Sequence, residues 1–306
     1  MLHFAVFGDI HGRVALMLTL ARLWEQHTGL RLSGILQVGD MGAFPDPSRL
    51  DDSTARMARD DADELGFASY CVPTEEGERY LGGRGVPVTA FIRGNHEDFE
   101  YLARFTEPEA VDPWHRLWYV PDGAVLELER EGRVIRVAGF GGISPRDEAS
   151  KGGKRSRRST DQVGSRGAPD PRCFSAEDAE RAFFGEAPID ILLTHAGPEH
   201  PDLPGGSPRL AALSRRLAPR VHLFGHHHVA LGPTEGPGGG LLVGLDHLEF
   251  GRRGELREAC AGVLTLDGER TSFEVFEPAA HPWLAAVRRD TYRALWPDSP
   301  AASNDA

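Results

Sequence analysis

The stretch Gly8-Asp9-Ile10-His11-Gly12 determines how the rest of this chain is interpreted. It follows the apolar run Leu2 to Phe7, which predicts a buried β-strand. Glycine on both sides permits a sharp exit from the strand and a close approach of a ligand to the backbone. Asp and His together offer the oxygen and nitrogen donors that divalent metals bind. Asp-x-His also arises by chance, so a metal site is predicted only because four later stretches are built in the same way.

These four stretches are also apolar segments that end in polar residues. They are Gly34 to Val38 before Asp40, Val86 to Ile92 before Asn95 and His96, Ile189 to Leu193 before His195, and Val221 to Phe224 before His226 and His228. Helical spacing of apolar residues from Arg13 to His27 predicts a right-handed crossover between the first two strands. Binding sites in open α/β sheets form at such strand ends, so we expect the polar residues to converge.

The residues expected to bind metal are Asp9, His11, Asp40, Asn95, His195, His226 and His228. A closed zinc site needs only four ligands, whereas this set suits two adjacent divalent ions with one bridging carboxylate. Oxygen and nitrogen donors without thiolates favour Mn, Fe, Zn or similar ions. We expect two divalent ions, Mn first, with Fe, Zn, Ni or Mg as alternatives.

Each of these residues also has an ordinary structural explanation. Asp9 and Asp40 could belong to caps or turns. Asn95 could adopt a left-handed turn, and a single histidine such as His195 is more often packed than bound to metal. We favour metal binding because the structural explanations would need five coincidences at equivalent strand ends.

The remaining histidines are predicted to be structural. His227 is left out of the site because alternate side chains of an extended segment point in opposite directions. The others have no strand-end setting of the kind described above, and they are His3, His27, His115, His200, His222, His247 and His281.

Length and composition are those of an ordinary globular protein of 306 residues, with 40% hydrophobic and 26% charged residues. We predict a single domain over residues 1–297 and a tail over 298–306. Apolar runs fall short of the roughly 20 residues of a membrane span, and we expect no signal peptide. Three dispersed cysteines favour a reducing cytoplasm. A net charge of −12 argues against non-specific nucleic-acid binding by the whole surface.

Two insertions are predicted within the domain. Residues 43–85 should form helices and loops over the strand ends, either as a solvated surface insertion or as a substrate lid. Residues 146–172 contain the basic run Lys151 to Arg158. This segment is either a disordered loop or a mobile arm that meets a polyanionic substrate. Near the end of the chain, Ala280 to Leu295 predicts a closing helix.

The motifs resemble a known family. Taken in order, they are Gly8-Asp9-x-His11, Gly39-Asp40, Gly94-Asn95-His96-Glu97, His195 and Gly225-His226-x-His228, and they resemble the calcineurin-like metallophosphoesterases over residues 2 to 228. The resemblance implies a four-layer α/β/β/α sandwich with two mixed β-sheets. It further implies one metal on Asp9, His11, Asp40 and His228, and a second metal on Asp40, Asn95, His195 and His226, with His96 as a catalytic residue.

The expected chemistry is phosphoester hydrolysis at a dinuclear centre. Two cations would bind phosphate oxygens, and a hydroxide bridging them would attack phosphorus in line. The carboxylate of Asp40 would bind both metal ions. His96 would stabilise the phosphoryl oxygens or protonate the leaving oxygen.

Departures from subfamily patterns point to a diester substrate. Gly39-Asp40-Met41-Gly42-Ala43-Phe44 lacks the phosphate-binding arginine of protein serine/threonine phosphatases, and Gly-His-x-His is more typical of phosphodiesterase-like members. Residues 80–145 and 205–229 resemble RNA lariat debranching enzymes, which cleave 2′,5′-phosphodiesters but have cysteine where this chain has Asp9. We therefore expect a cytoplasmic phosphodiesterase acting on a nucleotide, RNA or DNA. The alternatives are a phosphomonoesterase or protein phosphatase, and a non-catalytic metal-binding regulatory protein. Native metal, physiological substrate and oligomeric state stay open.

Overall fold

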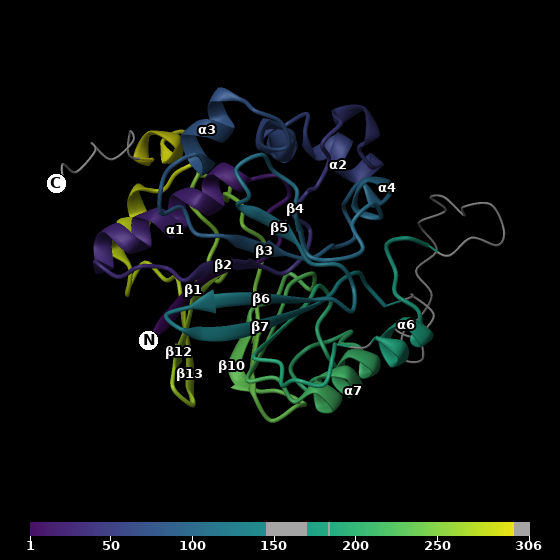
Figure 1. Cartoon of the computed structure of the whole chain (residues 1–306). Coiled ribbons are helices and arrows are strands. Elements are labelled where there is room, and N and C mark those ends of the chain that lie inside the picture. Colours follow the sequence, from purple (N-terminus) through teal and green to yellow (C-terminus); the bar gives the residue numbers. More distant parts are fainter. Residues whose placement is uncertain (145–169, 183, 297–306) are drawn as a thin grey trace.

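The computed structural model describes residues 1–144, 170–182 and 184–296 and contains two mixed β-sheets (Figure 1). The first sheet has the order β13-β12-β1-β2-β3-β5-β4, and the second has the order β10-β11-β9-β8-β7-β6. The strands of the first are β1 (Leu2–Phe7), β2 (Gly34–Gln37), β3 (Thr89–Phe91), β4 (Glu109–Ala110), β5 (Leu117–Tyr119), β12 (Ala261–Asp267) and β13 (Arg270–Val275). Those of the second are β6 (Val125–Arg130), β7 (Arg133–Phe140), β8 (Ile191–Thr194), β9 (Val221–Phe224), β10 (Leu231–Glu235) and β11 (Leu241–Gly244).

Helices cover the outer face of each sheet. The first sheet carries α1 (Val14–Thr28), α2 (Asp52–Met57), α3 (Glu75–Leu81) and α4 (Phe99–Leu102), and the second carries α6 (Ala176–Arg181) and α7 (Pro208–Leu217) (Figure 1). Short 3₁₀ helices complete the description: η1 (Pro47–Arg49), η2 (Ala62–Tyr70), η3 (Pro282–Ala286) and η4 (Tyr292–Leu295). The predicted α/β fold with two mixed sheets in a four-layer arrangement is confirmed.

Strand β1 is apolar at every position except His3, whose Nδ1 lies 3.0 Å from Thr265 Oγ1. Leu2, Phe4 and Val6 belong to the core between the two sheets. Ala5 and Phe7 belong to the core between the first sheet and its helices. Because successive side chains of a strand point to opposite faces, a strand covered on both faces carries apolar side chains on both of them. All six residues of β1 are buried.

Parallel pairing brings the motif-bearing strand ends to one edge of each sheet. In the first sheet β1 pairs parallel with β2, and β2 pairs parallel with β3. In the second sheet β8 pairs parallel with β9. The C-terminal ends of these strands carry every residue that the sequence predicted to bind metal. The fold therefore provides the convergence that the strand-end pattern required.

The C-terminal region differs from expectation. Instead of one helix over residues 280–295, the chain forms η3 and η4, which are separated by a β-bridge residue and a turn. Arg288 forms the isolated β-bridge with Glu255, and this bridge interrupts the helix. The side chains of both short helices still pack into the core beside α1, so burial did not require a continuous helix.

The predicted insertion at residues 43–85 contains η1, α2, η2 and α3, and Arg13 at the start of α1 holds it in place. Buried Arg13 donates hydrogen bonds to Asp61 and Glu64, both at 2.8 Å. The second predicted insertion falls largely outside the described residues, as do its basic run Lys151 to Arg158 and the tail. No helix in the described part of the chain is long and apolar enough to cross a membrane.

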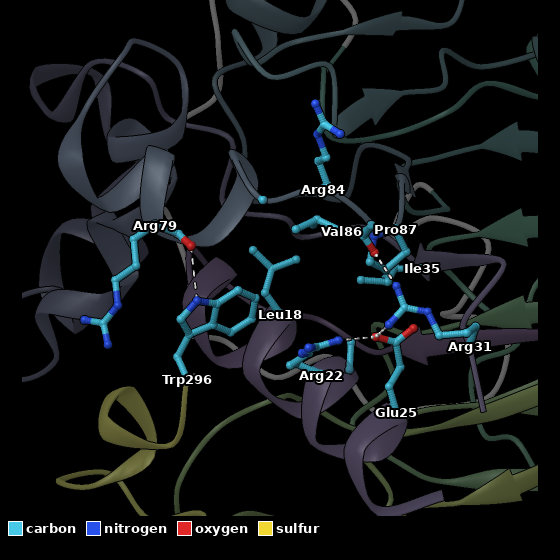
Figure 2. A pocket seen from close by; sticks show the side chains of 13 residues that line it. Leu18, Arg22, Glu25, Arg31, Ile35, Arg79, Arg84, Val86, Pro87 and Trp296 are labelled. Carbon is cyan, nitrogen blue, oxygen red and sulfur yellow. Dashed lines mark hydrogen bonds and ion pairs between the residues drawn. The ribbon is translucent and has the colours of Figure 1, made fainter. Parts of the chain in front are cut away.

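A cavity of about 210 Å³ lies beside α1, where Leu18, Val86 and Trp296 provide apolar walls (Figure 2). Buried Glu25 accepts from Arg22 at 3.1 Å and from Arg31 at 3.5 Å. These arginines surround a carboxylate that is already paired. The cavity shares no lining residue with the cavity at the motif-bearing strand ends.

Buried His222 on β9 is expected to make the fold acid-sensitive. Thr194 Oγ1 donates its hydrogen to Ala196 O, so the 2.8 Å contact with His222 Nε2 requires the ring to donate. Burial lowers the pKa of His222 to about 3. The unfolded chain therefore binds the extra proton below about pH 6.5, and the unfolding free energy falls as pH drops from about 6.5 towards 3.

We expect His222→Leu to remove about 2–3 kcal/mol of the stability difference between pH 7 and pH 4.5, measured by urea unfolding. The same substitution at exposed His27 is the control and should leave the pH dependence as in the wild type. An unchanged pH dependence in His222→Leu would show that this imidazole does not drive the acid sensitivity.

Candidate metal centre

The predicted ligands meet at the adjoining edges of the two sheets. His195 Nε2 lies 3.0 Å from Asn95 Oδ1 and 3.5 Å from Asp40 Oδ2. His195 Nδ1 lies 3.9 Å from Asp9 Oδ1, and His11 Nε2 lies 3.8 Å from Asp40 Oδ2. The first sheet supplies Asp9, His11, Asp40 and Asn95, and the second supplies His195 together with His226 and His228, which follow β9. Side chains distant in sequence thus form one polar cluster.

Four of the predicted ligands have a left-handed backbone conformation, which is unfavourable for residues with a Cβ. In the described residues, eight non-glycine residues have positive φ, and four of them are His11 (43°), Asp40 (52°), His226 (65°) and His228 (53°). Left-handed backbone costs energy for residues with a Cβ and concentrates at functional sites. The turns that aim these four side chains into the cluster are therefore strained.

The motif glycines make room for ligands from other segments. A Cβ on Gly94 would lie 2.0 Å from Asp40 Oδ1, and one on Gly225 would lie 2.2 Å from Asp9 Oδ1. Both distances are far inside van der Waals contact. Glycine precedes these ligands because the loops after β2 and β3, and those after β1 and β9, pack directly against one another.

Each aspartate also holds a neighbouring loop. Asp40 Oδ1 accepts from the backbone N–H of Asn95 at 2.6 Å and of His96 at 2.8 Å. Asp9 accepts from His226 N at 3.1 Å. Burial alone would raise the pKa of Asp40, but the neighbouring His195 holds it well below its ordinary value. The Asp9 pKa is likewise lowered by His195 against the effect of burial. Both side chains are therefore ionised and can bind a cation.

Glu97 fixes the same region without joining the cluster. Its carboxyl oxygens accept from the backbone N–H groups of Met41 at 3.0 Å, Ala43 at 2.5 Å and Gly94 at 3.2 Å. These bonds join the loop after β2 to the loop after β3. The sequence motif ends in Glu97 for this structural reason.

Three of the four imidazoles predicted as ligands are in the neutral state that metal binding requires. Burial lowers the pKa of His11 to about 4 and that of His226 to about 3. Burial also lowers the pKa of His228. These rings are neutral at pH 7 and keep a lone pair for a cation. At His195 burial would lower the pKa, but Asp40 and Asp9 raise it to about 9, so a cation bound there would displace a proton. His195 Nδ1 donates to Val38 O at 3.0 Å, which orients its other nitrogen towards Asn95 and Asp40.

His96 has a partner that sequence reasoning missed. Its Nδ1 lies 3.0 Å from Asp51 Oδ2, and Asp51 caps α2 by accepting from Ser53 and Thr54 N–H. Burial would lower the pKa of His96, but Asp51 and Asp40 raise it to about 9. Asp51 begins a charged run within the predicted insertion at residues 43–85, and nothing in that run indicates a partner 45 positions further along the chain.

Two other histidines, His227 and His247, lie near the cluster, and only His247 lines its cavity. His227 accepts a hydrogen bond from Gly197 N at 2.9 Å and does not line the cluster's cavity. His247, predicted to be structural, lies with its Nε2 3.3 Å from Asp9 Oδ2 and lines that cavity. A signal was present in the sequence, because His247 follows the apolar segment Leu241 to Val243 just as the predicted ligands follow theirs.

The cluster opens into a cavity of about 210 Å³. Its walls are His11, Asp40, Ser53, Thr54, Met57, Glu64, Asn95, His96, His226, His228, His247 and Glu249. Helix α2 of the 43–85 insertion forms one wall through Ser53, Thr54 and Met57. None of these lining residues, all in the described part of the chain, is Lys or Arg.

The donor set fits a divalent metal. Two groups, Asp9 with His11 and Asp40, and Asp9 with His228 and His247, each have ligand atoms within 4.8 Å of one another. Carboxylate oxygens and imidazole nitrogens without thiolates suit Mn, Fe, Zn and similar ions. Asp9 belongs to both groups, so the cluster has more donors than a single closed site uses.

Comparison with known proteins finds a family for most of the chain. The family model described as calcineurin-like phosphoesterase matches residues 2–230. No curated protein matches the chain. Among solved structures, TT1561 of Thermus thermophilus is 18% identical, with a TM-score of 0.49 and coverage of 89% of this chain and 98% of that one. GAP50, described as the anchor in the inner membrane complex of Plasmodium, is 11% identical, with a TM-score of 0.48 and coverage of 90% and 84%.

Proposed function

Because the chain belongs to the calcineurin-like phosphoesterase family, we propose that it hydrolyses phosphodiester bonds of a nucleotide or nucleic acid with two divalent metal ions. Members of this family are metal-dependent phosphoric ester hydrolases. The observation that carries the proposal is one polar cluster of seven donor residues, five of which line a single cavity together with His96, while Asp9 and His195 lie behind them. We further propose a cytoplasmic location, which the three free cysteines support.

The seven donors divide between two metal positions that share Asp40. In this proposal, one ion is held by Asp9, His11, Asp40 and His228, and the other by Asp40, Asn95, His195 and His226. When bound, two divalent ions, with Mn favoured, polarise the phosphoryl oxygens and lower the pKa of a nucleophilic water. The backbone N–H groups of Asn95 and His96 hold one oxygen of Asp40, which keeps the other oxygen directed at the imidazoles.

His96 is proposed to donate a proton to the leaving oxygen. Its Nδ1 is engaged by Asp51, which leaves Nε2 for a substrate in the cavity. Asp51 orients the ring and favours its protonated form, as a carboxylate does for a general acid. Because Asp51 caps α2, the wall formed by this helix and the orientation of His96 are linked. This linkage supports the lid interpretation of residues 43–85.

A diester substrate is favoured by the charge of the cavity. A phosphomonoester is largely dianionic at neutral pH, whereas a diester carries one negative charge. The lining includes Glu64 and Glu249, and no Lys or Arg is among the lining residues of the described part. Glu64 is paired with Arg13 and Glu249 with Arg257, so it is the lack of a cationic side chain among the described lining residues that disfavours a dianion. The resemblance to lariat debranching enzymes adds 2′,5′-linked RNA to the substrates worth testing.

Metal-dependent hydrolysis of bis-p-nitrophenyl phosphate, compared with p-nitrophenyl phosphate, tests the proposal. With Mn²⁺ we expect kcat/KM to be at least about tenfold higher for the diester, and EDTA should abolish the activity. Higher kcat/KM for the monoester would identify a phosphomonoesterase. Absence of hydrolysis of both substrates with Mn²⁺, Fe²⁺, Zn²⁺, Ni²⁺ and Mg²⁺ would favour the non-catalytic alternative.

A further inference from the structure

His247 is held at the metal-binding cavity by the backbone around it. Strand β11 pairs parallel with β9, so the residues after each strand emerge side by side. Leu245 N donates to Phe224 O at 3.0 Å, and Leu248 N donates to Asp9 O at 2.8 Å. These two bonds fix the segment that contains His247 between the ends of β9 and β1.

The His247 ring is directed at two of the expected ligands. Its Nε2 lies 3.3 Å from Asp9 Oδ2, and its ring centroid lies 3.5 Å from that of His228 in an edge-on arrangement. The centroid of His11 is 5.2 Å away. One donor atom each from Asp9, His228 and His247 lies within 4.8 Å of the other two. Three donors at this spacing can share a single cation.

The contact with Asp9 does not satisfy the ring nitrogen. His247 Nε2 is buried, and its one polar contact, with Asp9 Oδ2 at 3.3 Å, lacks the alignment of a good hydrogen bond. A buried ring nitrogen with a single misaligned contact is incompletely satisfied and gains from a further partner. A cation between His247, His228 and Asp9 would satisfy this nitrogen and separate two closely packed imidazoles.

We propose that His247 is an additional imidazole ligand of the cation held by Asp9 and His228. This inference rests on the proposed two-metal function. It gives this metal position three imidazoles, from His11, His228 and His247, whereas the position served by Asn95 has two. Nitrogen donors favour Zn²⁺ and Co²⁺ over Mn²⁺, so the two positions differ in metal preference.

Co²⁺ binding to the full-length protein, followed by calorimetry and visible absorption, tests this assignment. Wild type should bind two Co²⁺ ions. In His247→Ala and His247→Gln, one site should weaken at least about tenfold with a changed d–d spectrum, while the other site keeps its affinity. Glutamine retains a donor for Asp9 but lacks the imidazole nitrogen, so it separates metal ligation from hydrogen bonding. His27→Gln, a surface substitution on α1, is the matched control.

Different results would contradict the role of His247 and the two-metal proposal. Wild-type affinity and spectrum in His247→Gln, with two ions bound by the wild type, would overturn the role of His247 and leave the two-metal proposal intact. Fewer than two Co²⁺ ions bound by the wild type would overturn the two-metal proposal and this assignment with it. Thermal unfolding in EDTA shows whether each variant is folded before its metal affinity is compared.

Discussion

Asp40→Asn is expected to reduce kcat by about 10³-fold or more and to prevent tight binding of both metal ions. Asp40 is the proposed shared ligand, and its charge offsets both cations. Asparagine has the same shape, and its carbonyl oxygen can still accept from the N–H groups of Asn95 and His96. The fold should therefore survive while the charge is lost. Steady-state kinetics and metal analysis of the purified variant provide the measurement.

Asp112→Asn is the matched control for this experiment. Asp112 is also buried and also accepts backbone hydrogen bonds, from Trp114, Arg116 and Leu117, but it does not line the cavity. It should keep wild-type kcat and two bound metals even if it loses some stability. If Asp40→Asn retained more than a tenth of wild-type kcat with two metals bound, Asp40 would not be the shared ligand.

His96→Ala is expected to reduce kcat by about 10²- to 10⁴-fold while both metals remain bound. The ring is proposed to donate a proton, whereas the contact of this residue with Asp40 is made by its backbone N–H, which alanine keeps. The loss should be larger for a dinucleotide, whose leaving alkoxide needs a proton, than for bis-p-nitrophenyl phosphate. Metal content distinguishes this effect from loss of the centre.

Asp51→Asn tests whether Asp51 acts through His96. Alone it should reduce kcat by about tenfold, because the ring loses its charged partner at 3.0 Å. Combined with His96→Ala it should cause little further loss, since residues that act as a unit are not additive. If the losses from Asp51→Asn and His96→Ala were fully additive, Asp51 would not act through His96. If His96→Ala reduced kcat equally for the dinucleotide and for bis-p-nitrophenyl phosphate, His96 would not donate a proton to the leaving oxygen.

The sequence predicted those parts of the site that local patterns encode. An apolar strand, a glycine and a polar residue form a contiguous signal, which predicted Asp9, Asp40 and His226 as ligands. Two of the motif glycines have a packing cause that the sequence does not show, because Gly94 lies against Asp40 and Gly225 against Asp9.

The remaining features depend on contacts between distant segments. Asp51 meets His96 across 45 positions of sequence, and nothing in the charged run around Asp51 reveals its partner. His247 was set aside because the strand before it was not assigned to the ligand-bearing edge, although β11 pairs parallel with β9. The predicted closing helix failed for a similar reason, because the bridge from Arg288 to Glu255 interrupts it.

The division of donors between the two sheets has a mechanical consequence. The sheets otherwise meet through an apolar layer that includes Val6, Leu36 and Leu193. Cations bound jointly by Asp9 and His228, or by Asn95 and His195, would cross-link the sheets at one rim of this layer. The rigidity of the sandwich, and with it the resistance of the protein to proteolysis, would then depend on how much metal the cell supplies.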